Sequence, residues 1–340
     1  MDRPPIRPPA LHPGDLVGVV SPSAPTAHHT PRRFKRSVAH LQRLGFRVKV
    51  GPHTLNHHHH TAGTVEERLE DLHAMFADPE VKGILCTIGG HNANALLEGL
   101  DYALIQNNPK VFLGYSDITA LHLGMHTQTG LVTFLGPALL PQFGEADGLH
   151  PYTRRYLEAV LIEGRAPLEL EPSEILIHEH LLWDEEDNRP RRAEPHPGPK
   201  VLRPGTAQGP VIAGNLGTML ALCGTPFFPN LEGAILCVEE DETESPASVD
   251  RFLTQLRLMG AFAKIRALLV GRFHPKVGFG PEDPLEAVLL RATAGYDLPV
   301  AYGFDFGHTD PMFTLPIGTQ ARVAFGTEAR VWLLEPAVSV

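Results

Sequence analysis

The sequence has little cysteine, a shortage of basic residues and no long apolar run, and each shortage excludes a class of protein. Its three cysteines, Cys86, Cys223 and Cys237, lie far apart in apolar runs without CxxC spacing, as reduced, buried thiols do in a reducing compartment. Lysine and arginine total 29 against 39 aspartates and glutamates, a net charge of −10. This acidity disfavours a surface that binds nucleic-acid polymers by neutralising phosphates. No run approaches the roughly 18 apolar residues of a membrane span.

The amino terminus and the common cofactor motifs supply further absences. The opening "MDRPPIRPPALHPGD" has five prolines and no apolar core of a secretory signal, so we expect a cytoplasmic protein. Neither a GxGxxG motif nor a Walker lysine accompanies the Gly89-Gly90 pair, which disfavours dinucleotide binding. His122 and His126 have the spacing of a zinc pair, but the glutamate of HExxH is missing, and we expect no metal or other cofactor.

The first half of the chain alternates strand and helix patterns. One helix is expected to begin at Pro31 after the cap Thr30 and to end at Gly45. A second has Thr64 and Glu67 in capping-box spacing. Strand patterns lie at residues 16–20, 46–51, 83–88 and 110–116. Those at 83–88 and 110–116 are uniformly apolar, which is typical of strands buried on both faces. This order predicts an α/β domain with a doubly wound parallel sheet.

The second half shows a different organisation. Periodicity fails between about residues 144 and 200, where "WDEEDNRPRRAEPHPGPK" is so rich in charge and proline that we expect a loop or mobile flap. An amphipathic helix capped by Ser245 lies among six further strand patterns, at residues 209–215, 233–240, 266–273, 298–306, 320–326 and 330–336. We therefore predict an amino-terminal domain (1–145), a linker and flap (146–205), and a carboxyl-terminal α/β domain (206–340).

A candidate nucleophile lies in the stretch "KVFLGYSDITALHLG". Ser116 would lie at the tip of a buried strand with a helix directly behind it, and the free amides of a helix start point towards any oxygen placed there. This is the physics of a nucleophile elbow, although Ile118 occupies the position of the last glycine of GxSxG. The alternative is that Ser116 only caps the helix. As a nucleophile it requires a histidine that is oriented by a carboxylate.

Chain position selects the candidate partners among 19 histidines and many acids. The run His57–His60 reads as a polar loop without an assigned role, whereas His308 follows an apolar strand in a glycine-containing bend, the same topological location as Ser116. The alternative is a turn histidine beside Asp310.

Glu239 and Glu240 end the apolar strand "GAILCVEE". Strand alternation sends their side chains to opposite sides, so at most one reaches a shared cleft. Gly89 and Gly90 follow another strand and leave their backbone open to a ligand. That turn can donate an oxyanion amide, bind phosphate or simply reverse the chain.

Several motifs together resemble one family. "IGGHNANALLEGL", "GYSD", "VIAGNLGTMLALCGTP", "AILCVEEDE" and "FDFGHTDPMFTLPIGTQ" are similar, in order, to the motifs of the LD-carboxypeptidase family of serine peptidases, and in particular to its microcin C immunity (MccF-like) branch. The resemblance implies a flavodoxin-like amino-terminal domain, a smaller β-rich α/β carboxyl-terminal domain, a homodimer and no metal. By motif it implies Ser116 as nucleophile, Glu239 as orienting acid and His308 as base, with the amides of Gly90 and Asp117 as oxyanion donors.

The resemblance also implies a substrate. A cytoplasmic serine carboxypeptidase of this branch acts on peptidyl- or aminoacyl-nucleotide antibiotics of the microcin C type, and Gly89 and Trp183 would contact such a substrate. The flap offers no second tryptophan for a nucleotide clamp. An alternative is therefore an LD-carboxypeptidase that releases D-alanine from murein tetrapeptides. A third interpretation is a small-molecule binding protein without chemistry.

Overall fold

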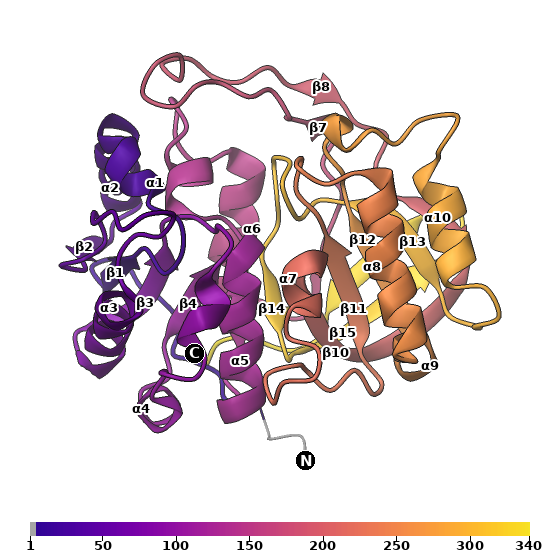
Figure 1. Cartoon of the computed structure of the whole chain (residues 1–340), viewed down its shortest axis with the longest axis horizontal. Coiled ribbons are helices and arrows are strands. Elements are labelled where there is room, and N and C mark those ends of the chain that lie inside the picture. The colour runs from indigo at the N-terminus through magenta and orange to yellow at the C-terminus, as the bar shows by residue number, and fades with distance from the viewer. Residues whose placement is uncertain (1–4) are drawn as a thin grey trace.

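A computed structural model describes residues 5–340, whose strands form two large sheets side by side (Figure 1). The first sheet has the order β14-β5-β4-β3-β1-β2. Its strands are β1 Leu16–Val20, β2 Arg47–Val50, β3 Val81–Cys86, β4 Val111–Gly114, β5 Thr133–Leu135 and β14 Leu315–Ile317. β1 to β5 pair in parallel. The order 2-1-3-4-5 is that of flavodoxin-like sheets, which confirms the expected fold.

Strand β14 comes from the far end of the chain and joins this sheet antiparallel to β5. The sheet of the amino-terminal half is thus completed by a segment from near the end of the chain, a pairing that no local sequence pattern predicts. Helices lie between the strands: α1 Thr26–His29, α2 Pro31–Arg43, α3 Val65–Ala77, η1 Ala93–Leu96, α4 Tyr102–Asn107, η2 Ser116–Ile118, α5 Thr119–Thr129 and the π-helix η3 Leu139–Phe143.

The two expected helix caps have different outcomes. The capping box is confirmed, because Thr64 Oγ1 accepts from the Glu67 amide (3.2 Å) and the Glu67 carboxylate accepts from the Thr64 amide (2.8 Å). The prediction that the Thr30 side chain caps α2 is wrong. The Thr30 hydroxyl donates to the Thr26 carbonyl (2.8 Å), because the short helix α1 immediately precedes it.

The start of α2 is capped instead from a distant segment. Asp184 accepts from the amides of Arg32 (2.8 Å) and Arg33 (2.6 Å). A carboxylate suits this position because the helix start carries free amides and the positive end of the helix dipole.

The second sheet has the order β6-β16-β15-β10-β11-β12-β13-β9. Its strands are β6 Leu168–Glu169, β9 Lys200–Arg203, β10 Gly205–Asn215, β11 Ile235–Glu239, β12 Ala267–Gly271, β13 Val300–Phe304, β15 Gln320–Phe325 and β16 Ala329–Leu333. β10 to β13 are parallel, and the outer strands are antiparallel. The accompanying helices are α7 Leu216–Leu220, α8 Pro246–Leu258, α9 Ala261–Lys264, η4 Pro275–Val277 and α10 Leu285–Ala292. Ser245 caps α8 as expected.

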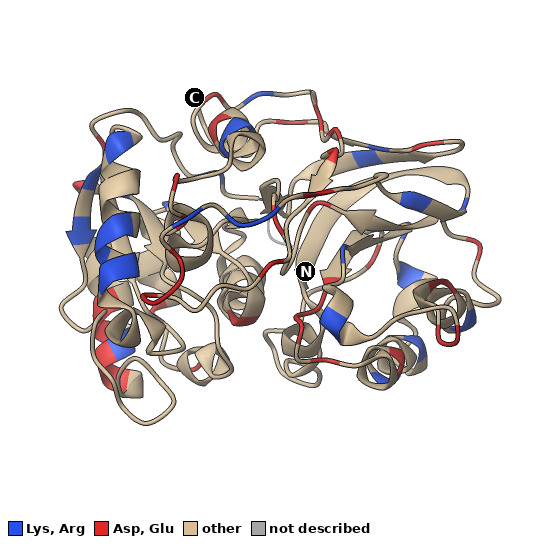
Figure 2. Ribbon diagram, turned by 90° about the horizontal axis from the view of Figure 1, so that it is seen from above, with Lys and Arg blue, Asp and Glu red and all other residues tan. Residues whose placement is uncertain are grey.

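The composition of the segment between the two sheets predicted a loop, but part of this segment has regular structure. It contains α6 Pro151–Leu161 and the small hairpin of β7 Ile175–Leu176 and β8 Glu194–Pro195. We call residues 178–196 the flap. In Figure 1 it arches over the top of the molecule towards β7 and β8, and Figure 2, seen from above, shows a charged segment crossing between the two halves. Among residues 5–340, no helix combines the length and apolarity needed to cross a membrane.

Candidate active site

Ser116 begins the turn η2 directly after Tyr115, at the end of β4. Its backbone φ is 65°, in the left-handed region that residues other than glycine seldom adopt. The strand end is held by His122, whose Nε2 donates to the Gly114 carbonyl (2.9 Å). Burial lowers the pKa of His122 to about 4, so this side chain is neutral. The fold thus holds Ser116 in a tight turn of the kind found at nucleophile elbows.

His308 and Glu239 meet in the second half of the chain. Glu239 ends β11 and is 1% exposed, and His308 follows β13. His308 Nδ1 donates to Glu239 Oε2 at 2.6 Å. Burial opposes the charged imidazole, but the Glu239 carboxylate outweighs burial and raises the pKa of His308 to about 9.

Gly307 permits this close approach. Its φ is 107°, and a methyl group there would lie 2.7 Å from Glu239 Oε2. A side chain at position 307 would therefore separate the acid from the imidazole.

Glu240 faces the opposite side of the strand, as alternation predicts. Its carboxylate accepts from Asn215 Nδ2 (2.9 Å) and from the Gly217 amide. Burial, together with the neighbouring charge of Glu239, raises the pKa of Glu240 to about 8. Glu239 therefore contacts His308, and Glu240 does not.

One cavity of about 450 Å³ brings most of the candidate residues together. Ser116, His308 and Trp183 line it, together with Gly89 and Gly90. Glu239 lies behind the imidazole and does not line it. The cavity wall approaches the serine closely, because a methyl group on Gly89 would lie 2.7 Å from Ser116 Cβ.

The Asp117 side chain forms hydrogen bonds with two other loops around this cavity, those that contain Ser23 and Ala93. Its carboxylate accepts from the hydroxyl of Ser23 (2.5 Å) and from the amide of Ala93 (2.8 Å). The amide of Ala24 donates to the Gly89 carbonyl (3.0 Å). The backbone amide of Asp117 lies in the first helical turn, where amides have no partner inside the helix. Sequence reasoning missed Ser23, although the loop "SPSAP" lies at the end of a strand.

Trp183 lies in the flap and is partly engaged by the protein itself. The Arg33 guanidinium lies over its ring, 4.2 Å from the centroid. Arg33 is 1% exposed and forms ion pairs with Glu145 (2.5 Å) and Asp187 (2.7 Å). These contacts dock the flap on α2, and sequence reasoning identified none of the charged groups involved.

Known proteins are similar to this chain over nearly its whole length. The family described as LD-carboxypeptidase N-terminal domain matches residues 17–136, and the LD-carboxypeptidase C-terminal domain matches residues 208–323. A probable murein peptide carboxypeptidase of Bacillus subtilis is 36% identical over 335 residues, which cover 98% of this chain and 95% of the relative.

Similarity extends to a self-immunity protein. The microcin C7 self-immunity protein MccF of Escherichia coli is 35% identical over 327 residues, covering 92% of this chain and 91% of the relative. The solved structure of MccF in complex with glutamyl sulfamoyl guanosine has a TM-score of 0.90 at 33% identity, covering 98% of this chain and all of that one (100%).

Proposed function

This chain belongs to the LD-carboxypeptidase family and is a carboxypeptidase, and from that premise we propose that Ser116, His308 and Glu239 carry out its chemistry. The observation that carries the proposal is the 2.6 Å bond between His308 and Glu239 beside a cavity that Ser116 also lines. With Nδ1 donating to Glu239, the Nε2 atom of the neutral imidazole is free to accept a proton.

In this mechanism His308 Nε2 takes the Ser116 hydroxyl proton while the Ser116 oxygen attacks the carbonyl carbon of the C–N bond that is to be cleaved. The amides of Gly90 and Asp117 stabilise the resulting oxyanion, each by about 3 to 4 kcal/mol. The C–N bond breaks, the amine leaves with the proton from His308, and an acyl-serine remains. Water then attacks the acyl-serine with His308 again as base, which releases the acid and restores Ser116.

The raised pKa of His308 predicts a pH dependence of activity. The base has to be neutral, so kcat/KM of the free enzyme should rise about tenfold per pH unit from about pH 6 to about pH 8 and level off near pH 9. The same pair stabilises the fold fully below the unfolded pKa of about 6.5, and this contribution is lost as pH rises through about 9. Initial rates across this range test the expectation. A plateau already reached near pH 6 would contradict the assigned base.

For the substrate we propose an aminoacyl- or peptidyl-nucleotide of the microcin C type, because Trp183 offers an aromatic surface in the cavity. MccF, to which the chain is similar, has been solved with glutamyl sulfamoyl guanosine. The second candidate is a murein tetrapeptide that ends in D-alanine. It is favoured by the lack of another flap aromatic, since the only other tryptophan, Trp332, lies in β16.

A two-substrate assay separates these candidates. Purified protein would be incubated with an aminoacyl sulfamoyl nucleotide and, separately, with a murein tetrapeptide, and the products weighed by mass spectrometry. We expect the aminoacyl sulfamoyl nucleotide to be hydrolysed to the free amino acid and the sulfamoyl nucleotide faster than the murein tetrapeptide releases D-alanine. If only D-alanine is released, the first proposed substrate is wrong and the murein tetrapeptide takes its place.

From the family resemblance we also propose that the protein is cytoplasmic and forms a homodimer. Sedimentation would test the oligomeric state.

A further inference from the structure

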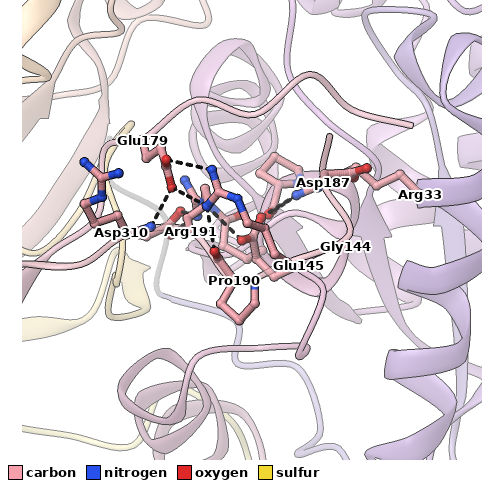
Figure 3. Close-up of polar contacts among 12 residues, drawn as sticks. Arg33, Gly144, Glu145, Glu179, Asp187, Pro190, Arg191 and Asp310 are labelled. Atoms are coloured by element: carbon pink, nitrogen blue, oxygen red, sulfur yellow. Dashed lines mark hydrogen bonds and ion pairs between the residues drawn. The ribbon is translucent and has the colours of Figure 1, made fainter. Parts of the chain in front are cut away.

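Arg191 lies where the flap meets both halves of the protein (Figure 3). Its side chain is 18% exposed, and its Nε donates to Glu145 Oε2 at 2.9 Å. Its Nη2 donates to the carboxylate of Asp310. Glu145 follows η3 in the first half, whereas Asp310 lies two residues after His308. One guanidinium thus joins the flap, the first half and the loop that carries His308.

Asp310 in turn contacts the neighbour of Ser116. The Gln142 amide nitrogen donates to Asp310 Oδ1 (3.2 Å) and to the hydroxyl of Tyr115 (3.3 Å). The ring of Tyr115 packs against that of His308, with centroids 5.0 Å apart. Tyr115 therefore contacts His308 directly and is also linked, through Gln142, to Asp310, which lies two residues after His308 in the same loop.

The flap holds the same loop by its backbone. Ile177, at the base of the flap, donates to the Asp310 carbonyl (2.6 Å) and accepts from the Asp310 amide (3.0 Å). Farther along, Asp184 and Asp187 bind the flap to α2. Arg191 is the flap side chain that binds the carboxylate of Asp310.

The ion pair between Arg191 and Asp310 matters because Asp310 is buried. Asp310 is 6% exposed, and a buried carboxylate without a counter-charge is strongly destabilising. Burial opposes the charge on Arg191, but Asp310 and Glu145 keep its pKa above its usual range. Without the Arg191 guanidinium, Glu145 would keep its ion pair with Arg33, but Asp310 would lose the cation that faces it. Both acids lie in the wall that the cavity beside Ser116 shares with a second cavity of about 320 Å³.

We propose that Arg191 is a positioning residue: by holding Asp310 it fixes the His308 loop against Ser116 when the flap is docked. The proposal rests on the proposed function, because it assumes that Ser116 and His308 react together. It gives the flap a role in the chemical step.

The test compares Arg191→Ala with Arg189→Ala, a matched change in the same flap. Arg189 forms a bidentate pair with Glu179 and has a side chain that is 49% exposed. We expect Arg191→Ala to lower kcat about 100-fold with little change in KM, since misplacing a catalytic group by an ångström has that effect. Arg189→Ala should change kcat by no more than about twofold. Arg191→Lys, which keeps the charge, should recover part of the loss.

Two further measurements keep the result interpretable. The rate at which a fluorophosphonate labels Ser116 should fall in parallel with kcat, and it needs no knowledge of the substrate. If the wild type is labelled but hydrolyses neither substrate, the substrate assignment fails while the role of Arg191 is still tested. Arg191→Ala/Asp310→Asn should lose no more than Arg191→Ala alone, because the two residues act as a unit. A raised KM with unchanged kcat, equal effects at positions 189 and 191, or additive losses would overturn the proposal.

Discussion

Replacing Ser116 with alanine should lower kcat by about six orders of magnitude, the loss seen when a serine peptidase loses its nucleophile. Alanine cannot form the acyl-enzyme, and only the oxyanion donors and substrate binding remain. The fold should change little, because the left-handed backbone at position 116 is nearly as accessible to alanine as to serine. Steady-state hydrolysis measures the effect.

Thermal unfolding and calorimetric binding provide the controls for Ser116→Ala. Both should resemble the wild type, because the hydroxyl is absent from the contacts that hold η2 in place: the bond from His122 to Gly114 and those to the carboxylate of Asp117. Hydrolysis at the wild-type rate in this variant would remove Ser116 from the mechanism.

Replacing Glu239 with glutamine should lower kcat by about four orders of magnitude, as does loss of the acid in other Ser-His-acid triads. Glutamine keeps the size of the side chain but loses the charge that stabilises the imidazolium and fixes its tautomer. The plateau of the pH profile should also move to lower pH, because Glu239 is the group that raises the pKa of His308.

Glu240→Gln is the matched control for this prediction, since Glu240 directly follows Glu239, the last residue of β11. With a pKa of about 8, Glu240 is largely protonated at neutral pH, so glutamine resembles its native form. We expect a change of about threefold or less in kcat, because Glu240 contacts Asn215 and Gly217 and does not contact His308. Equal losses in the two variants would contradict the assignment of Glu239.

Local sequence signals predicted much of the fold. The apolar run at residues 16–20 is β1, and the capping box at Thr64 begins α3. Helix α6 was missed even though Tyr156, Leu157 and Val160 form a buried face, because the charge and proline content of the surrounding segment obscured its period. The placement of β14 had no local signal, since its pairing with β5 joins segments far apart in the chain.

The residues of the candidate site likewise include some that local sequence patterns predicted and some that they could not. Alternation along β11 predicted that Glu239 and Glu240 face opposite sides, but only the family resemblance selected between them. Arg191 could not be found from the sequence. Its partners are 46 and 119 residues away in the chain, and an arginine in a charged loop is indistinguishable from a solvated one until the fold is known.

The most direct test of the account is to identify the residue that a fluorophosphonate modifies in the native protein. We expect one adduct, on Ser116, that forms at neutral pH, is lost on heat denaturation, and forms far more slowly in Glu239→Gln. An unmodified Ser116, or an adduct on another serine with activity abolished, would contradict the claim that Ser116, His308 and Glu239 form one catalytic unit.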